Sequence, residues 1–366
     1  MDLYSEASSG TRSLTPRHIS ADKVLPEINN AINSTLLCHK YSNNPEFASY
    51  YSALYPYAWV LWGCGLPLLI VIWILYAISL RSAMRHWRDF VSYIAVILSV
   101  YPIVATGAFI TIVLPRFRIP AEAISQQIVT VALFNFFRLL IAECGGMDEI
   151  IRRTSGLHLE TRVLPCCCWP CCFIPRPMIT KKSLMGLHYL VLQMPVIQAI
   201  LYVIILAIWA EDFNLYSRNF LYFQPFVAAS ILPGIWGIVM CVRTSTLLGL
   251  NPKARFLSIQ LALIIVKLQV GISKSLADLI HGPCLVNLHP VVFVSLVQNC
   301  IMVVEMCLVS IWAWRLYSVP PEKVLKNVAT GKSISTVDDN LRAIEVETVK
   351  EGIDNKTFNN NVNIDD

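Results

Sequence analysis

Seven long apolar runs are the feature that most constrains this chain of 366 residues. Each run is about as long as the roughly 20 residues that a helix needs to cross about 30 Å of hydrocarbon. Only 14% of the residues are charged, whereas a soluble domain carries about 25%. A membrane barrel would alternate apolar and polar residues instead. The sequence therefore predicts an all-α integral membrane protein, a bundle of seven transmembrane helices. The predicted spans are residues 56–80, 90–114, 121–142, 184–209, 220–242, 256–280 and 290–312.

The basic residues between the runs predict the orientation of the bundle. The loops after the first, third and fifth runs carry most of them, and the other loops carry few. Because basic loops stay in the cytosol, we expect the N-terminus outside and the C-terminus inside. The residues of the basic loops are Arg81, Arg85, Arg88, Arg152, Arg153, Arg162, Arg176, Lys181, Lys182, Arg243, Lys253 and Arg255. Those of the other loops are Arg116, Arg118 and Arg218.

This orientation divides the chain into three parts. Residues 1–55 are an extracellular segment, and residues 56–314 are the transmembrane domain, with a cysteine-rich cytosolic loop at 143–183. Residues 315–366 are a cytosolic tail, which low hydrophobicity and high charge predict to be disordered. No apolar signal-peptide core precedes the first run, so we expect the first span to direct insertion.

Two sequons and two cysteines test the orientation. Asn33 starts an Asn-Ser-Thr sequon on the expected outer side, whereas the sequon at Asn355 lies in the expected cytosolic tail. Cys38 and Cys284 are the two cysteines expected outside the bilayer on the outer side. Oxidising surroundings permit a disulfide between them.

Five cysteines lie close together in the basic loop between the third and fourth runs. S-acylation needs only thiols held at the bilayer surface, where proline, tryptophan and basic neighbours keep a loop. A zinc site needs about four separated ligands, and the loop offers one Cys-x-x-Cys spacing. We expect S-acylation and no metal, while a soft-metal site and an unmodified reduced loop stay open. The five are Cys166, Cys167, Cys168, Cys171 and Cys172.

Polar side chains inside the spans predict a substrate path or a buried polar seam. A charge at the bilayer centre costs about 2.5 to 3.5 kcal/mol on insertion scales, so such groups face a partner or a cavity. Lys267 and Lys274 share one helix face, and Lys274 and Asp278 are one turn apart and can pair. Two interpretations stay open for the lysines, an ion pair with Glu305 or contact with an anionic solute. The full set is Arg138, Glu143, Lys267, Gln269, Lys274, Asp278, Gln298, Asn299 and Glu305.

Several function classes find no motif in this sequence. It has no phosphate-binding loop, no HExxH, no GxSxG and no kinase signature. Nothing therefore predicts catalysis, a cofactor or ATP-driven transport. The net charge of +5 is spread over several loops, so it does not indicate nucleic-acid binding.

The chain resembles the alpha-subunit family of the organic solute transporter. The resemblance covers nearly the whole membrane portion, but neither the tail after about residue 320 nor the lysines of the sixth span. Its most specific element is the cysteine cluster. The stretches that carry it are Thr15 to Asp22 (TPRHISAD), Glu143 to Gly146 (ECGG), Pro165 to Cys172 (PCCCWPCC), and Gln298 and Asn299 with Glu305.

The resemblance implies a facilitative, sodium-independent carrier of amphipathic organic anions such as steroid conjugates and bile-acid-like solutes. It also implies a single-span beta subunit as partner, at the plasma membrane among membrane lipids. A seven-span signalling receptor has the same topology, but the third span lacks an acidic-Arg-aromatic triplet and the seventh lacks Asn-Pro-x-x-Tyr. A non-transporting regulator of lipid or vesicle traffic, on endomembranes, stays open.

Overall fold

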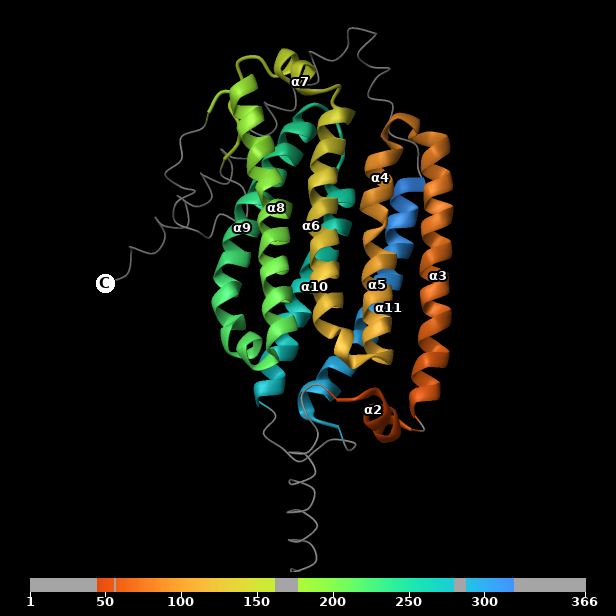
Figure 1. Cartoon of the computed structure of the whole chain (residues 1–366). Coiled ribbons are helices and arrows are strands. Elements are labelled where there is room, and N and C mark those ends of the chain that lie inside the picture. Colours follow the sequence, from red (N-terminus) through yellow and green to blue (C-terminus); the bar gives the residue numbers. More distant parts are fainter. Residues whose placement is uncertain (1–44, 56, 162–176, 280–287, 319–366) are drawn as a thin grey trace, which may run out of the picture.

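The computed structural model describes residues 45–55, 57–161, 177–279 and 288–318 (Figure 1). Several expectations lie outside these residues. They concern Asn33, Asn355, Cys38, Cys284, the five cysteines between 166 and 172, and the tail after residue 318.

Long helices stand side by side in one bundle (Figure 1). Within the described ranges, seven helical segments are long and apolar enough to cross a membrane, so the predicted all-α bundle of seven spans is confirmed. The helices are α2 (Phe47–Leu54), α3 (Tyr57–His86), α4 (Val91–Leu98), α5 (Val100–Val113), α6 (Arg118–Glu143), α7 (Met147–Arg153), α8 (Lys181–Glu211), α9 (Phe213–Leu247), α10 (Lys253–Leu279) and α11 (Pro290–Ser318).

The helices extend beyond several predicted spans, because a helix need not end where the hydrocarbon does. The first span, predicted to end at residue 80, continues through Arg85 to His86. The second span is interrupted, with α4 ending at Leu98 and α5 beginning at Val100. Pro102 has no N–H to donate to the carbonyl of Leu98, so the helical ladder is broken there.

Helix α6 is the centre of the bundle. It packs against α4, α5, α8, α9 and α10. Outside this centre, α3 packs against α4, α5 and α11, so that the first and last spans are neighbours. Helix α10 packs against α6 and α11. The position of α6 means that any path through the bundle runs beside it.

The pair α8 and α9 packs especially closely. Gly234 and Gly237 of α9 face α8, and a Cβ atom at Gly237 would lie 2.9 Å from Cγ2 of Val191. Small residues allow membrane helices to approach in this way. The two glycines of α9 therefore form a packing surface for α8.

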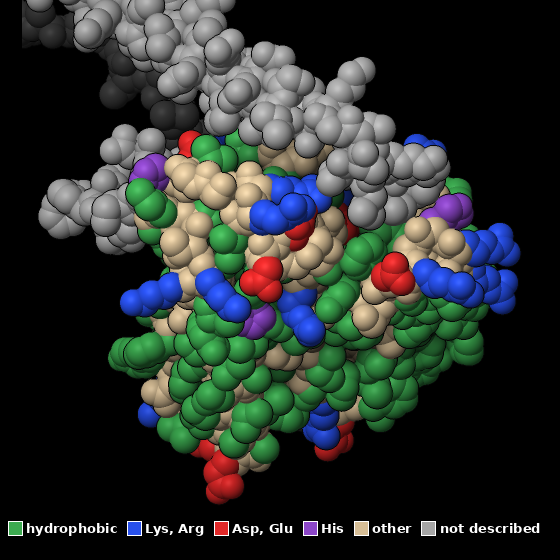
Figure 2. Space-filling model, turned by 90° about the horizontal axis from the view of Figure 1, so that it is seen from above, with side chains coloured by type: hydrophobic (Ala, Val, Ile, Leu, Met, Phe, Trp, Pro, Cys, Tyr) green, Lys and Arg blue, Asp and Glu red, His purple; other side chains and the backbone are tan. Residues whose placement is uncertain are grey.

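Each end of the bundle is marked by a short helix. We name them the α7 end and the α2 end, after the short helices that lie there (Figure 1). Viewed from the α7 end, Lys and Arg side chains gather on a mostly apolar body (Figure 2). Here Gly145 and Gly146, with φ of 91° and 93°, end α6. Hydrogen bonds from Arg152 and Arg153 lower the pKa of the Glu149 carboxyl to about 2.

The base of the cysteine-rich loop is closed at the α7 end. His158 and Met178 form an antiparallel bridge, and the N–H of Leu159 donates to the carbonyl of Pro177 at 2.8 Å. The side-chain Nε1–H of Trp236 in α9 donates to the carbonyl of Thr161 at 3.0 Å. The loop therefore leaves and re-enters the bundle at one place, beside α9.

Candidate functional site

A buried polar network surrounds Lys267, midway along α10. The Lys267 Nζ donates to the hydroxyl of Tyr202 in α8 at 3.0 Å and to Oε1 of Gln198 at 3.4 Å. The Tyr202 hydroxyl in turn donates to Oε1 of Gln126 in α6 at 2.7 Å. This chain of hydrogen bonds joins α10, α8 and α6 inside the bundle. We call Lys267, Tyr202, Gln126, Gln198 and Ser230 the lysine network.

The network continues into α9 through Gln198. This side chain is fully buried, and its Nε2 donates to Oγ of Ser230 at 2.6 Å and to the carbonyl of Val227 at 3.1 Å. Both ends of the amide are thus satisfied, as a buried polar group requires. The lysine is therefore held by neighbours that are themselves fixed in place.

A small cavity lies on the other side of the contact between α6 and α10. Ser125 and Val266 line this cavity, while their chain neighbours Gln126 and Lys267 belong to the lysine network. Its volume is about 60 Å³, enough for a few water molecules. The other lining residues come from α5, α6, α10 and α11. They are Val104, Ala108, Arg118, Ala121, Glu122, Val270, Ser273, Val291, Ser295, Gln298, Asn299 and Met302.

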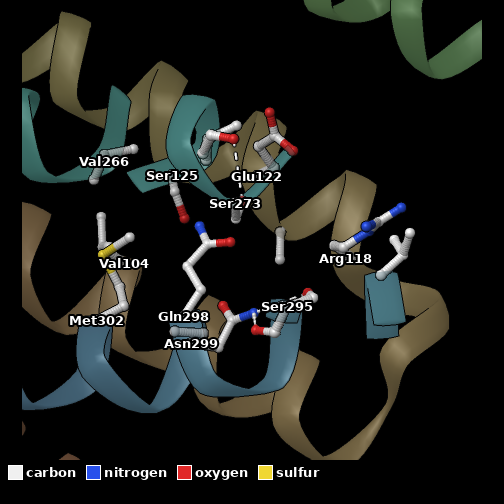
Figure 3. Close-up of a pocket in the computed structure, with 14 residues that line it drawn as sticks. Val104, Arg118, Glu122, Ser125, Val266, Ser273, Ser295, Gln298, Asn299 and Met302 are labelled. Atoms are coloured by element: carbon white, nitrogen blue, oxygen red, sulfur yellow. Dashed lines mark hydrogen bonds between the residues drawn. The ribbon is translucent and has the colours of Figure 1, made fainter. Parts of the chain in front are cut away.

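Gln298 and Asn299 of α11 contribute to the cavity in different ways. Gln298 points from α11 into the cavity (Figure 3). Asn299 is held along its own helix, because its Nδ2 donates to the carbonyl of Ser295 at 2.7 Å. Arg118 and Glu122 come from the first turns of α6, at the α2 end. The cavity is therefore polar on its α11 side and towards the α2 end.

Glu305 is bonded by Gln269 across the contact between α10 and α11, where Nε2 of Gln269 donates to Oε2 of Glu305. An ion pair between Lys267 and Glu305, one of the two interpretations left open by the sequence, is not among the ion pairs of the described residues. Successive helical residues are about 100° apart around the axis, so Gln269 and Lys267 face nearly opposite sides of α10. Lys267 therefore faces α8, and Gln269 faces α11.

Glu143 forms a buried ion pair at the α7 end. Both terminal nitrogens of the Arg255 guanidinium donate to this carboxylate, Nη1 to Oε1 and Nη2 to Oε2, the latter at 2.9 Å. The Arg255 and Glu143 side chains are 11% and 4% exposed. The Arg255 guanidinium also lies 5.0 Å from the ring centre of Trp87. Arg255, expected in a cytosolic loop, thus ties the first turn of α10 to the end of α6.

Arg138 is separate from the lysine network. It is exposed on the outer side of α6, where it lies over the ring of Tyr93 from α4. The structure thus places the expected polar residues at five separate positions. These are the lysine network, the Gln269–Glu305 bond, the cavity with Gln298 and Asn299, the Glu143–Arg255 pair and the exposed Arg138. The side chains of Lys274 and Asp278 lie outside the described parts of the structure.

Sequence reasoning missed the partners of Lys267. Gln126, Gln198 and Tyr202 lie in predicted spans but were not singled out. The signal was present for the two glutamines, because a buried amide in an apolar run needs a hydrogen-bond partner. Tyr202 carried no such signal, because tyrosine is common in membrane helices.

Seven long apolar helices define a multi-pass membrane protein. The chain matches the family described as Organic solute transporter Ostalpha over residues 61–322, and it belongs to that family. This match confirms the resemblance seen in the sequence. The family is one of membrane transporters.

Two curated relatives are distant in sequence. The organic solute transporter alpha-like protein of Drosophila melanogaster is 26% identical over 242 residues, which is 65% of this chain and 73% of that protein. The organic solute transporter subunit alpha of Danio rerio is 26% identical over 186 residues, which is 49% of this chain and 56% of that protein. No solved structure matches the chain significantly.

Proposed function

We propose that this protein is a facilitative, sodium-independent carrier of amphipathic organic anions, such as steroid conjugates and bile-acid-like solutes. The observation that carries the proposal is the amine of Lys267, held by Tyr202 and Gln198 midway along a membrane helix. Ionisable groups at such depth mark solute pathways. A positive charge suits the acidic head of the solute, and the surrounding helices suit its apolar body.

The small cavity beside the network supports a carrier that changes shape. Sites for drug-sized ligands enclose about 300 to 1,000 Å³, far more than the 60 Å³ found here. We propose that the structure is a closed state and that α10 moves away from α6 to admit the solute. The sequence contains no nucleotide-binding motif, which supports downhill movement.

We propose a single-span beta subunit as partner and the plasma membrane as the site of action. The support is the family and the name of the Danio rerio relative, which is described as a subunit. The test is uptake of a radiolabelled sulfated steroid into cells that express the chain alone or with a small single-span partner. Saturable uptake that does not need sodium is expected with the partner. Uptake no higher than in untransfected cells, with the chain at the surface, would overturn the proposal.

The role of Lys267 is tested by Lys267→Met, which keeps an apolar stem but removes the charge. We expect near-normal surface level and uptake reduced about tenfold or more, since a hydrogen bond to a charged group contributes about 1.5 to 3 kcal/mol. Lys182→Met is the matched control, because Lys182 is exposed at the α7 end. Equal uptake by both variants would move the pathway away from the lysine network.

A further inference from the structure

Helix α6 has few residues that are exposed on the outside of the bundle. In its described length, Arg118–Glu143, the strongly exposed residues are Ile124 and Arg138. Between them, half-buried residues such as Ile128, Val131 and Asn135 form a narrow outer stripe. In Figure 1 this helix lies between α8 on one side and α4 and α5 on the other. An arginine is thus exposed at one end of an otherwise mostly apolar stripe.

Aromatic side chains hold the guanidinium of Arg138 in place. Its Nη2 donates to the hydroxyl of Tyr93 at 3.4 Å, and its central carbon lies 5.0 Å from the Tyr93 ring centre and 5.9 Å from that of Phe134. Such contacts attract a cation without neutralising it. Among the described residues, no carboxylate lies within ion-pair distance of Arg138.

The imidazole of a histidine lies beside the arginine. The ring of His188 in α8 contacts Phe134 and Phe137, with ring centres 5.5 Å and 6.0 Å apart. Its Nδ1 is buried and finds no hydrogen-bond partner in the described part of the chain. Three helices, α4, α6 and α8, therefore bring a fixed guanidinium, a hydroxyl and an imidazole together.

These groups lie at the level of the lipid headgroups if the helices span a bilayer. Arg138 is five residues before the end of α6, about 7 Å along the axis. Tyr93 is in the first turn of α4, and His188 is in the second turn of α8. Helix α6 ends at the α7 end, and α4 and α8 begin there. The three groups therefore lie a short way into the bundle from the basic residues at that end. Basic groups at that depth attract anionic lipids.

We propose that Arg138, Tyr93 and His188 form a membrane-facing site for the phosphate of an anionic phospholipid, whose acyl chain lies along the outer stripe of α6. The planar guanidinium matches an oxyanion with two parallel hydrogen bonds. A lipid in the leaflet at the α7 end presents its phosphate at this level and its chain beside the stripe. The proposal does not depend on transport activity.

Native mass spectrometry of the purified full chain tests the site, with phosphatidylserine and phosphatidylcholine of equal chain length as probes. Arg138→Gln should weaken phosphatidylserine binding about tenfold, because it removes charge-assisted hydrogen bonds. It should weaken phosphatidylcholine binding less, because the choline cation balances the charge of that lipid's phosphate. Arg85→Gln is the matched control, because Arg85 is exposed in the last turn of α3 at the same end. Phosphatidylserine binding that is equal in Arg138→Gln and wild type, or equally reduced in both variants, would overturn the site.

Two further measurements separate a bound lipid from a bound solute and from a general effect of charge. Tyr93→Leu leaves the charge but removes the ring and the hydroxyl that fix it, so weaker phosphatidylserine binding is expected. Tyr93→Phe keeps the ring and loses only the hydroxyl, so its binding should lie between that of Tyr93→Leu and that of wild type. A sulfated steroid is the third probe. If Arg138→Gln weakens binding of the steroid but not of phosphatidylserine, the lipid assignment is wrong and the site belongs to a solute. All of these outcomes are read from binding, so they hold whether or not the protein transports.

Discussion

Glu305 places a carboxylate inside the bundle against the amide of Gln269 rather than against a lysine. This partner changes what a substitution should do. Glu305→Gln keeps a side chain that can bond Gln269, so we expect a stability close to that of wild type. Glu305→Leu removes the acceptor and leaves a buried amide unsatisfied, which costs about 1 to 3 kcal/mol.

Thermal unfolding in detergent measures the difference between these two variants. A loss of stability in Glu305→Gln as large as in Glu305→Leu would mean that a cation, not Gln269, is the important partner of the carboxylate. Gln269→Leu should then have little effect, whereas the observed bond predicts that it is destabilising.

The lysine network shows which features of a single residue can be predicted from the sequence and which cannot. The position of Lys267 within an apolar run and its charge were sufficient to select it, because a cation there needs a polar partner. One of the two interpretations paired it with Glu305 of α11, because a short loop joins α10 and α11, and the other left it to an anionic solute. That pairing ignored the direction of each side chain around the axis, which only the packing of α6 and α8 against α10 decides.

At the scale of helices, Gly237 limits how closely α8 and α9 can pack. Gly237→Ala would place a methyl group 2.9 Å from Val191, and such overpacking costs about 1 to 3 kcal/mol. Gly186→Ala is the matched control, because no atom lies within 4 Å of a Cβ there. The control should be neutral or slightly stabilising, because glycine in a helix is worse than alanine by about 0.5 to 1 kcal/mol. A lower melting temperature in both variants would contradict the packing argument.

The base of the cysteine-rich loop is closed at the α7 end by the bridge between His158 and Met178. We expect thioester-linked acyl chains on this loop, each buried methylene contributing about 0.8 kcal/mol of membrane affinity. Hydroxylamine-sensitive labelling should disappear when the five loop cysteines become serine, and it should persist in Cys64→Ser, since Cys64 is an exposed cysteine of α3. Labelling that survives the fivefold change would contradict acylation, and bound zinc lost in it would favour a metal site.

Hydropathy was sufficient to predict seven spans, because the cost of leaving backbone polar groups in lipid allows little besides helices. It could not predict the interruption at Ser99 or the short helix α7. Those depend on a proline within an apolar run and on contacts at the end of the bundle.

For the whole molecule, the orientation of the bundle is the property that the basic loops predict. We expect Asn33 to carry a glycan and Asn355 to carry none. Glycosidase treatment should shift the mobility of the wild-type chain, and Asn33→Gln should abolish the shift. A shift that persists in Asn33→Gln and vanishes in Asn355→Gln would reverse the topology.

The contact between α3 and α11 also limits the order in which the helices can pack during synthesis. Helix α3 packs against α11, which is the last of the seven spans to be synthesised. Until then the side of α3 that faces α11 lacks this neighbour. The first span therefore completes its packing only after the seventh has been inserted, and we expect chains truncated before α11 to be degraded faster than the full chain.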